Sequence, residues 1–144
     1  MNDLHDLTLI LQSRFPLVVV ETHEEPRVLA LLEQAANLEG WALFVWSIAD
    51  GLRRSGNSQP ITQTYEFLDA LRHIDKTPQN GLYVLLDAHP YLSDPVNARL
   101  IREIAMDHGQ AARTLVLVSP RLELNAELSR MSARFALSVP DLEA

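Results

Sequence analysis

Five short apolar runs, separated by segments with apolar residues at helical spacing, constrain the fold of this chain most strongly. Apolar runs that do not alternate with polar residues are typical of strands buried on both faces of a sheet. Strands that alternate with helices favour right-handed crossovers and a parallel sheet. We therefore predict an α/β domain with three layers (αβα), in which helices cover both faces of a five-stranded parallel sheet. The predicted strands cover residues 17–20, 42–47, 82–87, 114–119 and 135–139.

The helices between these strands are recognised by their apolar stripes and by their end signals. Gly40 is a suitable C-terminal stop for the second helix, and Asp94 followed by Pro95 is a strong start for the fourth. The polar stretch 50–60 is expected to be a loop because it contains glycine, asparagine and proline. The helices are expected near residues 4–11, 26–39, 65–74, 95–108 and 124–131.

The start of the second helix has two incompatible predictions. Thr22 with Glu25 fits a capping box. The better fit has Glu25 as the cap and Pro26 as the first helical residue, a position that proline favours because no N–H donor is needed there.

The composition fits one ordinary globular domain spanning residues 1–144, with 47% hydrophobic and 22% charged residues and no cysteine. The lack of cysteine excludes disulfides, thiolate metal sites and a cysteine nucleophile. A net charge of −7 and a single lysine, Lys76, argue against nucleic-acid binding, which depends on basic side chains at the phosphates. No apolar run approaches the roughly 18–20 residues of a membrane span. Residues 1–6 contain no Lys or Arg, unlike a secretory signal, so we expect a cytoplasmic protein without membrane contact.

Three features of the sequence resemble parts of a nucleotide-hydrolysing domain. Residues 82–87 (Leu-Tyr-Val-Leu-Leu-Asp) look like a Walker B strand, whose final carboxylate holds Mg²⁺ directly or through water. Ser119 follows the apolar residues 115–118 and resembles the sensor residue of AAA-type ATPases, where a small polar group contacts the terminal phosphate or the attacking water. Arg134 and Phe135 resemble the Arg-Phe pair that precedes the last strand of that core.

The order of these features, together with residues 15–21, 24–29 and 46–52, resembles one group of proteins from about Leu4 to the end of the chain. These are the AAA-family ATPases of cyanobacteria, plastids and many other bacteria that carry a degenerate domain ahead of the true ATPase domain. The resemblance implies a P-loop-NTPase-like core with strand order 5-1-4-3-2 in chain numbering. It also implies that this chain is the N-terminal fragment of a longer ATPase, in which ATP and Mg²⁺ bind a downstream domain.

Two departures from a hydrolysing domain stand out. The first strand-to-helix turn needs G-x-x-x-x-G-K-[ST], so that backbone N–H groups and a lysine surround the phosphates. Here residues 21–27 contain no glycine, no lysine and three carboxylates, and Pro26 removes an N–H donor. The residue after Asp87 is Ala88, where hydrolysing AAA domains have a glutamate that activates water. We therefore predict a non-hydrolysing accessory domain for assembly, regulation or partner recognition, with no catalytic residue and no bound cofactor of its own.

Asp87 and Ser119 are the candidate site residues, as degenerate Walker B and sensor positions. Each also has a structural explanation, because a carboxylate at a strand end can cap the next loop and a Ser-Pro pair commonly ends a strand in a turn. Ligands of parallel sheets bind at the carboxyl ends of the strands. The segments to inspect are therefore 21–24, 50–54, 87–89 and 119–121.

A metal site has weak support in the sequence. Glu21 with His23, and Asp87 with His89, are pairs of ligand-type residues spaced two apart at strand ends. The two pairs would converge only if their strands were neighbours, and no H-E-x-x-H spacing is present. A polar rim is the preferred interpretation, and no metal is predicted.

Four exposed arginines have two interpretations. In AAA rings, which this chain resembles, exposed arginines can reach the nucleotide of a neighbouring subunit. The preferred expectation is that they pair with nearby acids on the surface. They are Arg53, Arg54, Arg99 and Arg102. The partners of the domain are expected to be protein: its own downstream ATPase domain, with a second copy of the chain as an open alternative.

A second functional hypothesis is a stand-alone receiver-like or flavodoxin-like signalling domain with Asp87 as phosphoacceptor. The acids Glu21, Glu24 and Glu25 loosely imitate the acidic cluster of such a domain. A receiver also needs a lysine near the end of its last strand, and none follows Lys76.

Overall fold

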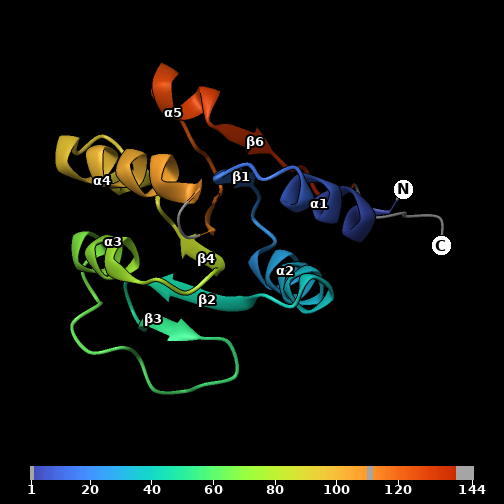
Figure 1. Ribbon diagram of the computed structural model, residues 1–144, viewed down its shortest axis with the longest axis horizontal. Helices are drawn as coiled ribbons and strands as arrows, with labels where there is room; N and C mark the ends of the chain where they lie inside the picture. Colours follow the sequence, from blue (N-terminus) through green and yellow to red (C-terminus); the bar gives the residue numbers. More distant parts are fainter. Residues whose placement is uncertain (1, 110–111, 139–144) are drawn as a thin grey trace.

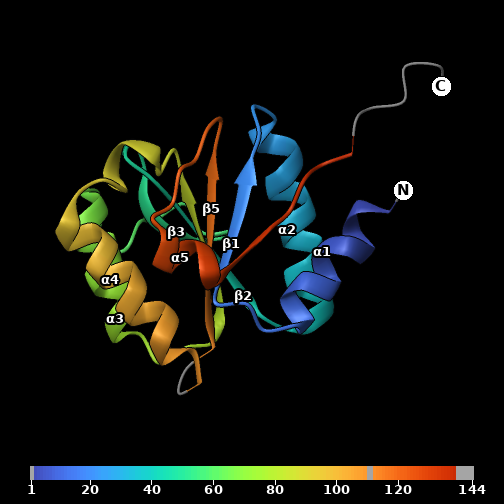
Figure 2. The same cartoon turned by 90° about the horizontal axis from the view of Figure 1, so that it is seen from above.

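A computed structural model, which describes residues 2–109 and 112–138, has three layers with a central sheet (Figure 1). Helices α1 and α2 cover one face of the sheet, and α3, α4 and α5 cover the other (Figure 2). The α/β prediction is therefore confirmed. The helices are α1 (Asp3–Gln12), α2 (Glu25–Glu39), α3 (Phe67–Lys76), α4 (Pro95–Met106) and α5 (Ala126–Arg130), with 3₁₀ turns at His89–Tyr91 and Asp107–Gly109.

The sheet formed by the described residues has six strands in the order β3-β2-β4-β5-β1-β6. Five of these strands run parallel in the order predicted from the family resemblance, and β3 is an additional, antiparallel strand beside β2. The sheet is therefore mixed rather than purely parallel. Its strands are β1 (Leu17–Glu21), β2 (Ala42–Ser47), β3 (Gly51–Arg54), β4 (Gly81–Leu86), β5 (Arg113–Ser119) and β6 (Ser132–Arg134).

Strand β3 corrects the prediction that 50–60 is entirely loop. Gly51 has a φ of 70°, which permits a tight reversal directly after β2. The Leu52 N–H donates to Thr64 Oγ1 at 3.0 Å, and the Leu52 carbonyl accepts from the Ile61 N–H at 2.8 Å. The loop after β3 thus satisfies the outer edge of the strand, which lets a polar segment act as an edge strand.

The last strand lies earlier in the chain than the predicted residues 135–139. Residues 132–134 pair with β1, and the Phe135 N–H makes one more bond to the Val19 carbonyl. The Phe135 side chain is buried in the core beneath α1 and α2, so its apolar character reflects packing at the end of the strand. Val139 lies outside the described residues.

The start of α2 matches neither prediction. Glu24 occupies the N-cap position without a side-chain cap bond, and Pro26 is in the first turn. Thr22 Oγ1 accepts a hydrogen bond from the Glu24 N–H at 3.0 Å, which closes a local turn before the helix. The other end signals are confirmed: Gly40 ends α2 at a φ of 71°, and Asp94 caps α4 through the N–H groups of the next turn.

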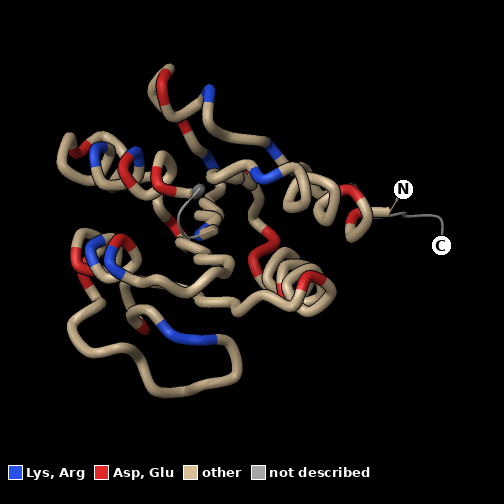
Figure 3. Tube along the Cα trace, viewed as in Figure 1, with Lys and Arg blue, Asp and Glu red and all other residues tan. Residues whose placement is uncertain are grey.

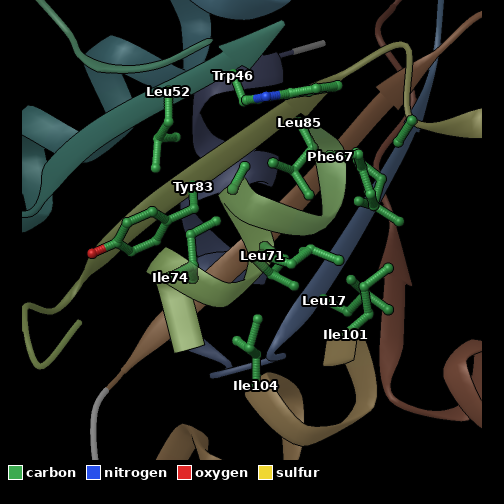
Figure 4. Close-up of a cluster of buried hydrophobic side chains, with 14 of the residues drawn as sticks. Leu17, Trp46, Leu52, Phe67, Leu71, Ile74, Tyr83, Leu85, Ile101 and Ile104 are labelled. Carbon is green, nitrogen blue, oxygen red and sulfur yellow. The ribbon is translucent and has the colours of Figure 1, made fainter. Parts of the chain in front are cut away.

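Alternate residues along each central strand point to opposite faces of the sheet, and each face has its own apolar core. The core under α3 and α4 contains Trp46, Phe67 and Tyr83 (Figure 4). The core under α1 and α2 contains the intervening residues, such as Val18 and Val116. Burial on both faces explains why these strands read as continuous apolar runs.

Candidate functional site

The carboxyl ends of β1, β5 and β4 lie side by side, which brings the two candidate residues into one place. Glu21 pairs with Ser119 across β1 and β5. The Asp87 N–H donates to the Val118 carbonyl at 2.8 Å, so Asp87 is level with Ser119 on the next strand. The sequence therefore correctly predicted that the ends of these strands would meet at one edge of the sheet.

Asp87 leaves β4 in an unusual backbone conformation, with a φ of 54°. Non-glycine residues rarely adopt this left-handed region, although Asp and Asn tolerate it better than most. The Asp87 side chain is exposed, whereas the following residue, Ala88, is completely buried. The position of the activating glutamate is thus occupied by a small side chain packed in the core.

The turn from β1 to α2 is held by its own side chains and by neighbouring strands. Glu21 forms an ion pair with Arg134 of β6, and this bond lowers the pKa of the Glu21 carboxyl. The Thr22 N–H donates to the Ser119 carbonyl at 2.9 Å. Arg27 Nη1 donates to Glu24 Oε2 at 3.0 Å. Two of the three acids in this turn therefore pair with arginines, and no glycine-lined phosphate loop exists here.

Glu25, the third acid, faces a like charge. Its carboxyl is half-buried at the start of α2, and burial together with the negative charge of Asp87 raises its pKa above the ordinary value of 4.5. In a phosphate-binding domain this space, between the first helix and the strand-end carboxylate, holds phosphate and Mg²⁺. Here two carboxylates occupy its borders, which favours cations or water over an anion.

Replacing Asp87 by asparagine is expected to raise the free energy of unfolding at pH 7 by about 0.5 kcal/mol, the scale of an exposed charge pair. Asparagine tolerates the positive φ and removes the charge beside Glu25. Because the pKa of Glu25 is raised on folding, its ionisation disfavours the folded state only above its unfolded pKa. The gain should therefore vanish as the pH falls below about 4. Urea unfolding at several pH values measures this.

The matched control is Asp50→Asn. Asp50 is an exposed aspartate that pairs with Arg53 at 3.4 Å, so its replacement should be neutral or slightly destabilising. A loss of stability in D87N at pH 7 would contradict the like-charge interpretation.

Ser119 is buried, with 1% of its surface exposed. Its hydroxyl accepts a hydrogen bond from the His89 N–H at 3.3 Å and so ties the loop after β4 to the end of β5. This contact supports the structural explanation of Ser119, as a residue that fixes two strand-end loops.

The remaining ligand-type residues do not converge. Strand β5 lies between β1 and β4, so Glu21 with His23 and Asp87 with His89 are not on neighbouring strands. Among residues 2–109 and 112–138, no group of three or more His, Asp or Glu side chains is close enough to hold a metal ion.

Three of the four singled-out arginines pair with local acids, as expected for surface side chains. Their partners are Asp50 for Arg53 at 3.4 Å, Glu103 for Arg99 at 3.1 Å and Glu127 for Arg102 at 2.6 Å.

Sequence reasoning missed a hollow on the other side of the same edge. A cavity of about 520 Å³ opens between the loop after β4 and the loop before α5. Its lining comes from two segments about thirty residues apart, and no local pattern links them. The only signal was that His89 and Arg121 lie within three residues of the ends of β4 and β5. The lining residues are His89, Leu92, Ser93, Arg121, Glu123, Leu124 and Asn125.

The sheet has the strand order expected for an AAA-like α/β core, and the turn after β1 has neither the glycines nor the lysine of a phosphate loop. Residues 3–137 match the family described as "SpoVK-like AAA ATPase, N-terminal domain". The chain belongs to this family, which confirms the resemblance drawn from the sequence.

Similar proteins come from algae, and each bears the name "Uncharacterized AAA domain-containing protein ycf46". The protein of Guillardia theta is 30% identical over 132 residues, which are 90% of this chain and 26% of that protein. The protein of Pyropia yezoensis is 24% identical over 145 residues, 99% of this chain and 29% of that protein. The protein of Trieres chinensis is 22% identical over 139 residues, which are 94% of this chain and 28% of that protein. The chain thus spans less than a third of the length of these relatives.

Within the described residues, none of the helices has both the length and the apolar character that crossing a membrane requires.

Proposed function

We propose that this domain is a non-hydrolysing accessory domain of an AAA-family ATPase, with a role in assembly, regulation or partner recognition. The observation that carries the proposal is the turn from β1 to α2, which contains no glycine and no lysine and has the carboxylates of Glu25 and Asp87 at its borders. Bringing a triphosphate to this place would add like charge to two acids, and the turn offers neither glycine nor lysine to offset that repulsion.

ATP and Mg²⁺ would then act in another domain of the parent protein. Two findings support this: the family is described as the N-terminal domain of SpoVK-like AAA ATPases, and the algal relatives are more than three times as long as the matched region. The partner that this domain serves is then the downstream ATPase domain, or a second copy of the chain, in a cytoplasmic protein. The receiver-like alternative gains no support from the family match.

Isothermal titration calorimetry of the 144-residue chain with ATP and Mg²⁺ tests the proposal. We expect no binding tighter than about 1 mM, which corresponds to about −4 kcal/mol. The D87N variant should behave in the same way, because it removes one acid without creating a phosphate loop. A micromolar dissociation constant for ATP, abolished by D87N in the presence of Mg²⁺, would overturn the proposal and restore a working Walker B carboxylate.

A further inference from the structure

A groove runs between α4 and α5 and begins at the loops that follow β4 and β5. The cavity of about 520 Å³ at the strand ends is adjoined by a second one of about 450 Å³ along the two helices. Leu92, Ser93 and Asn125 line both, so the two cavities form one open groove. Both views place α5 beside α4 on the same face of the sheet (Figures 1 and 2). The second cavity adds Pro95, Ala98, Arg99, Arg102, Glu127 and Leu128 to the lining.

The floor of this groove is apolar. Leu92 and Leu124 are half-buried and pack against the core under α3 and α4. Leu128 is almost completely buried behind them. Anchored leucines keep an apolar strip in place while leaving part of each side chain open to a partner. An apolar side chain lying in the groove would therefore gain contacts without rearranging the core.

The rim of the groove carries more positive than negative charge, in a chain whose net charge is −7. Three arginines line it, against two glutamates, and bands of both signs are visible along α4 and α5 (Figure 3). Arg121 is exposed and forms no close ion pair with any residue that the structure describes, and its charge acts at longer range on the Glu21 carboxylate, whose pKa it helps to lower. The pairs of Arg99 and Arg102 are exposed and so contribute little, which leaves these guanidinium groups available to other acids.

We propose that this groove binds an apolar segment flanked by acidic residues on a partner protein. The proposal rests on the accessory role argued above and names the surface that performs it. The arginines on the rim would bind the acidic residues of the partner, and the leucines on the floor would bind its apolar residues. A peptide suits the groove better than a nucleic acid, because the floor is formed by leucines and the chain is acidic overall.

Fluorescence anisotropy tests this with a short labelled peptide that carries two leucines flanked by glutamates. The expected dissociation constant is on the order of 10–100 µM, as in weak transient complexes. Arg121→Glu should weaken binding about tenfold or more, and Leu124→Glu should do so too if circular dichroism shows that it folds. Arg72→Glu is the matched control: it reverses an exposed charge on α3, outside the groove, and should change binding less than twofold.

The proposal is overturned if R121E binds the peptide as tightly as the wild type, or if a peptide with lysines in place of the glutamates binds equally well. Preference for a single-stranded oligonucleotide would overturn it in favour of nucleic acid. Self-association in light scattering that R121E abolishes would overturn it in favour of a second copy. ATP titrated with Mg²⁺ into the same samples separates the two proposals, because micromolar ATP binding that D87N abolishes refutes the accessory role whether or not the peptide binds.

Discussion

Replacing Arg113 by methionine is expected to lower the free energy of unfolding by about 3 kcal/mol. Only 1% of the Arg113 side chain is exposed. Its Nη1 donates to the carbonyls of Ile74 and Asp75 at 2.6 Å each, and its Nη2 donates to Asp107 Oδ2 at 2.8 Å. The first two bonds satisfy carbonyls at the C-terminal end of α3, where a positive charge is also favourable.

Methionine keeps most of the aliphatic stem but removes the guanidinium donors. The Ile74 carbonyl still accepts from the Thr77 N–H at 3.1 Å, whereas the Asp75 carbonyl loses its donor. Asp107 is half-exposed, so water can take over its carboxylate, and the main loss falls on the Asp75 carbonyl at the end of α3. Arg113→Lys should be more stable than R113M because it keeps a positively charged donor. It should remain less stable than the wild type, because one ammonium group cannot reproduce the several donors of the planar guanidinium.

Urea unfolding followed by circular dichroism measures these differences. Arg99→Met is the control, because Arg99 is exposed and forms a single ion pair within its own helix. We expect that change to cost less than about 0.5 kcal/mol. Equal stability of R113M and R99M would show that the buried guanidinium does not stabilise the domain.

Replacing Trp46 by alanine is expected to lower the free energy of unfolding by about 4 kcal/mol, the usual effect of deleting a large buried aromatic side chain. Trp46 is fully buried on β2, and its ring meets Phe67 and Tyr91 edge-on with centroids 5.2 and 5.7 Å apart. Its Nε1 also donates to the Thr64 carbonyl at 2.8 Å. The side chain therefore joins the sheet, the loop after β3 and the start of α3.

Trp46→Phe separates the two contributions. It keeps most of the apolar contact but leaves the buried Thr64 carbonyl without a donor, and should cost about 1–3 kcal/mol. Trp41 is only half-buried, so Trp41→Ala is the control and should cost clearly less than Trp46→Ala. Circular dichroism is the suitable probe, because the chain has only these two tryptophans and fluorescence would lose one of them. A W46A variant as stable as W41A would contradict this account.

Local signals in the sequence predicted the strands well where both faces of a strand are buried. Val18 and Val116 lie in strands covered on both faces, so their runs are apolar throughout and easy to recognise. Strand β3 was missed because an edge strand needs few apolar residues, and its outer edge is satisfied by Thr64 and Ile61 from a later loop. Phe135 was assigned to a strand because the sequence does not distinguish an apolar residue that packs in the core from one that is paired within a sheet.

Some features of the candidate site were also visible in the sequence, whereas others appeared only in the structure. The loss of the phosphate loop is visible in residues 21–27, and the loss of the activating glutamate is visible at Ala88, since both depend on residue type at one place. The opposition of Glu25 and Asp87 was not visible, because it joins residues about sixty positions apart. The same holds for the ion pair that removes Glu21 from the acidic cluster.

By itself, the sequence determined the α/β architecture and the absence of a phosphate loop, because hydrophobic periodicity and turn chemistry are local properties. Its strand order followed from resemblance to a known core and was confirmed by the sheet. Only the tertiary structure decided which charges face each other, which carbonyls Arg113 satisfies and where α4 and α5 leave a groove. These depend on distances between segments far apart in the chain, and such distances exist only once the layers have packed.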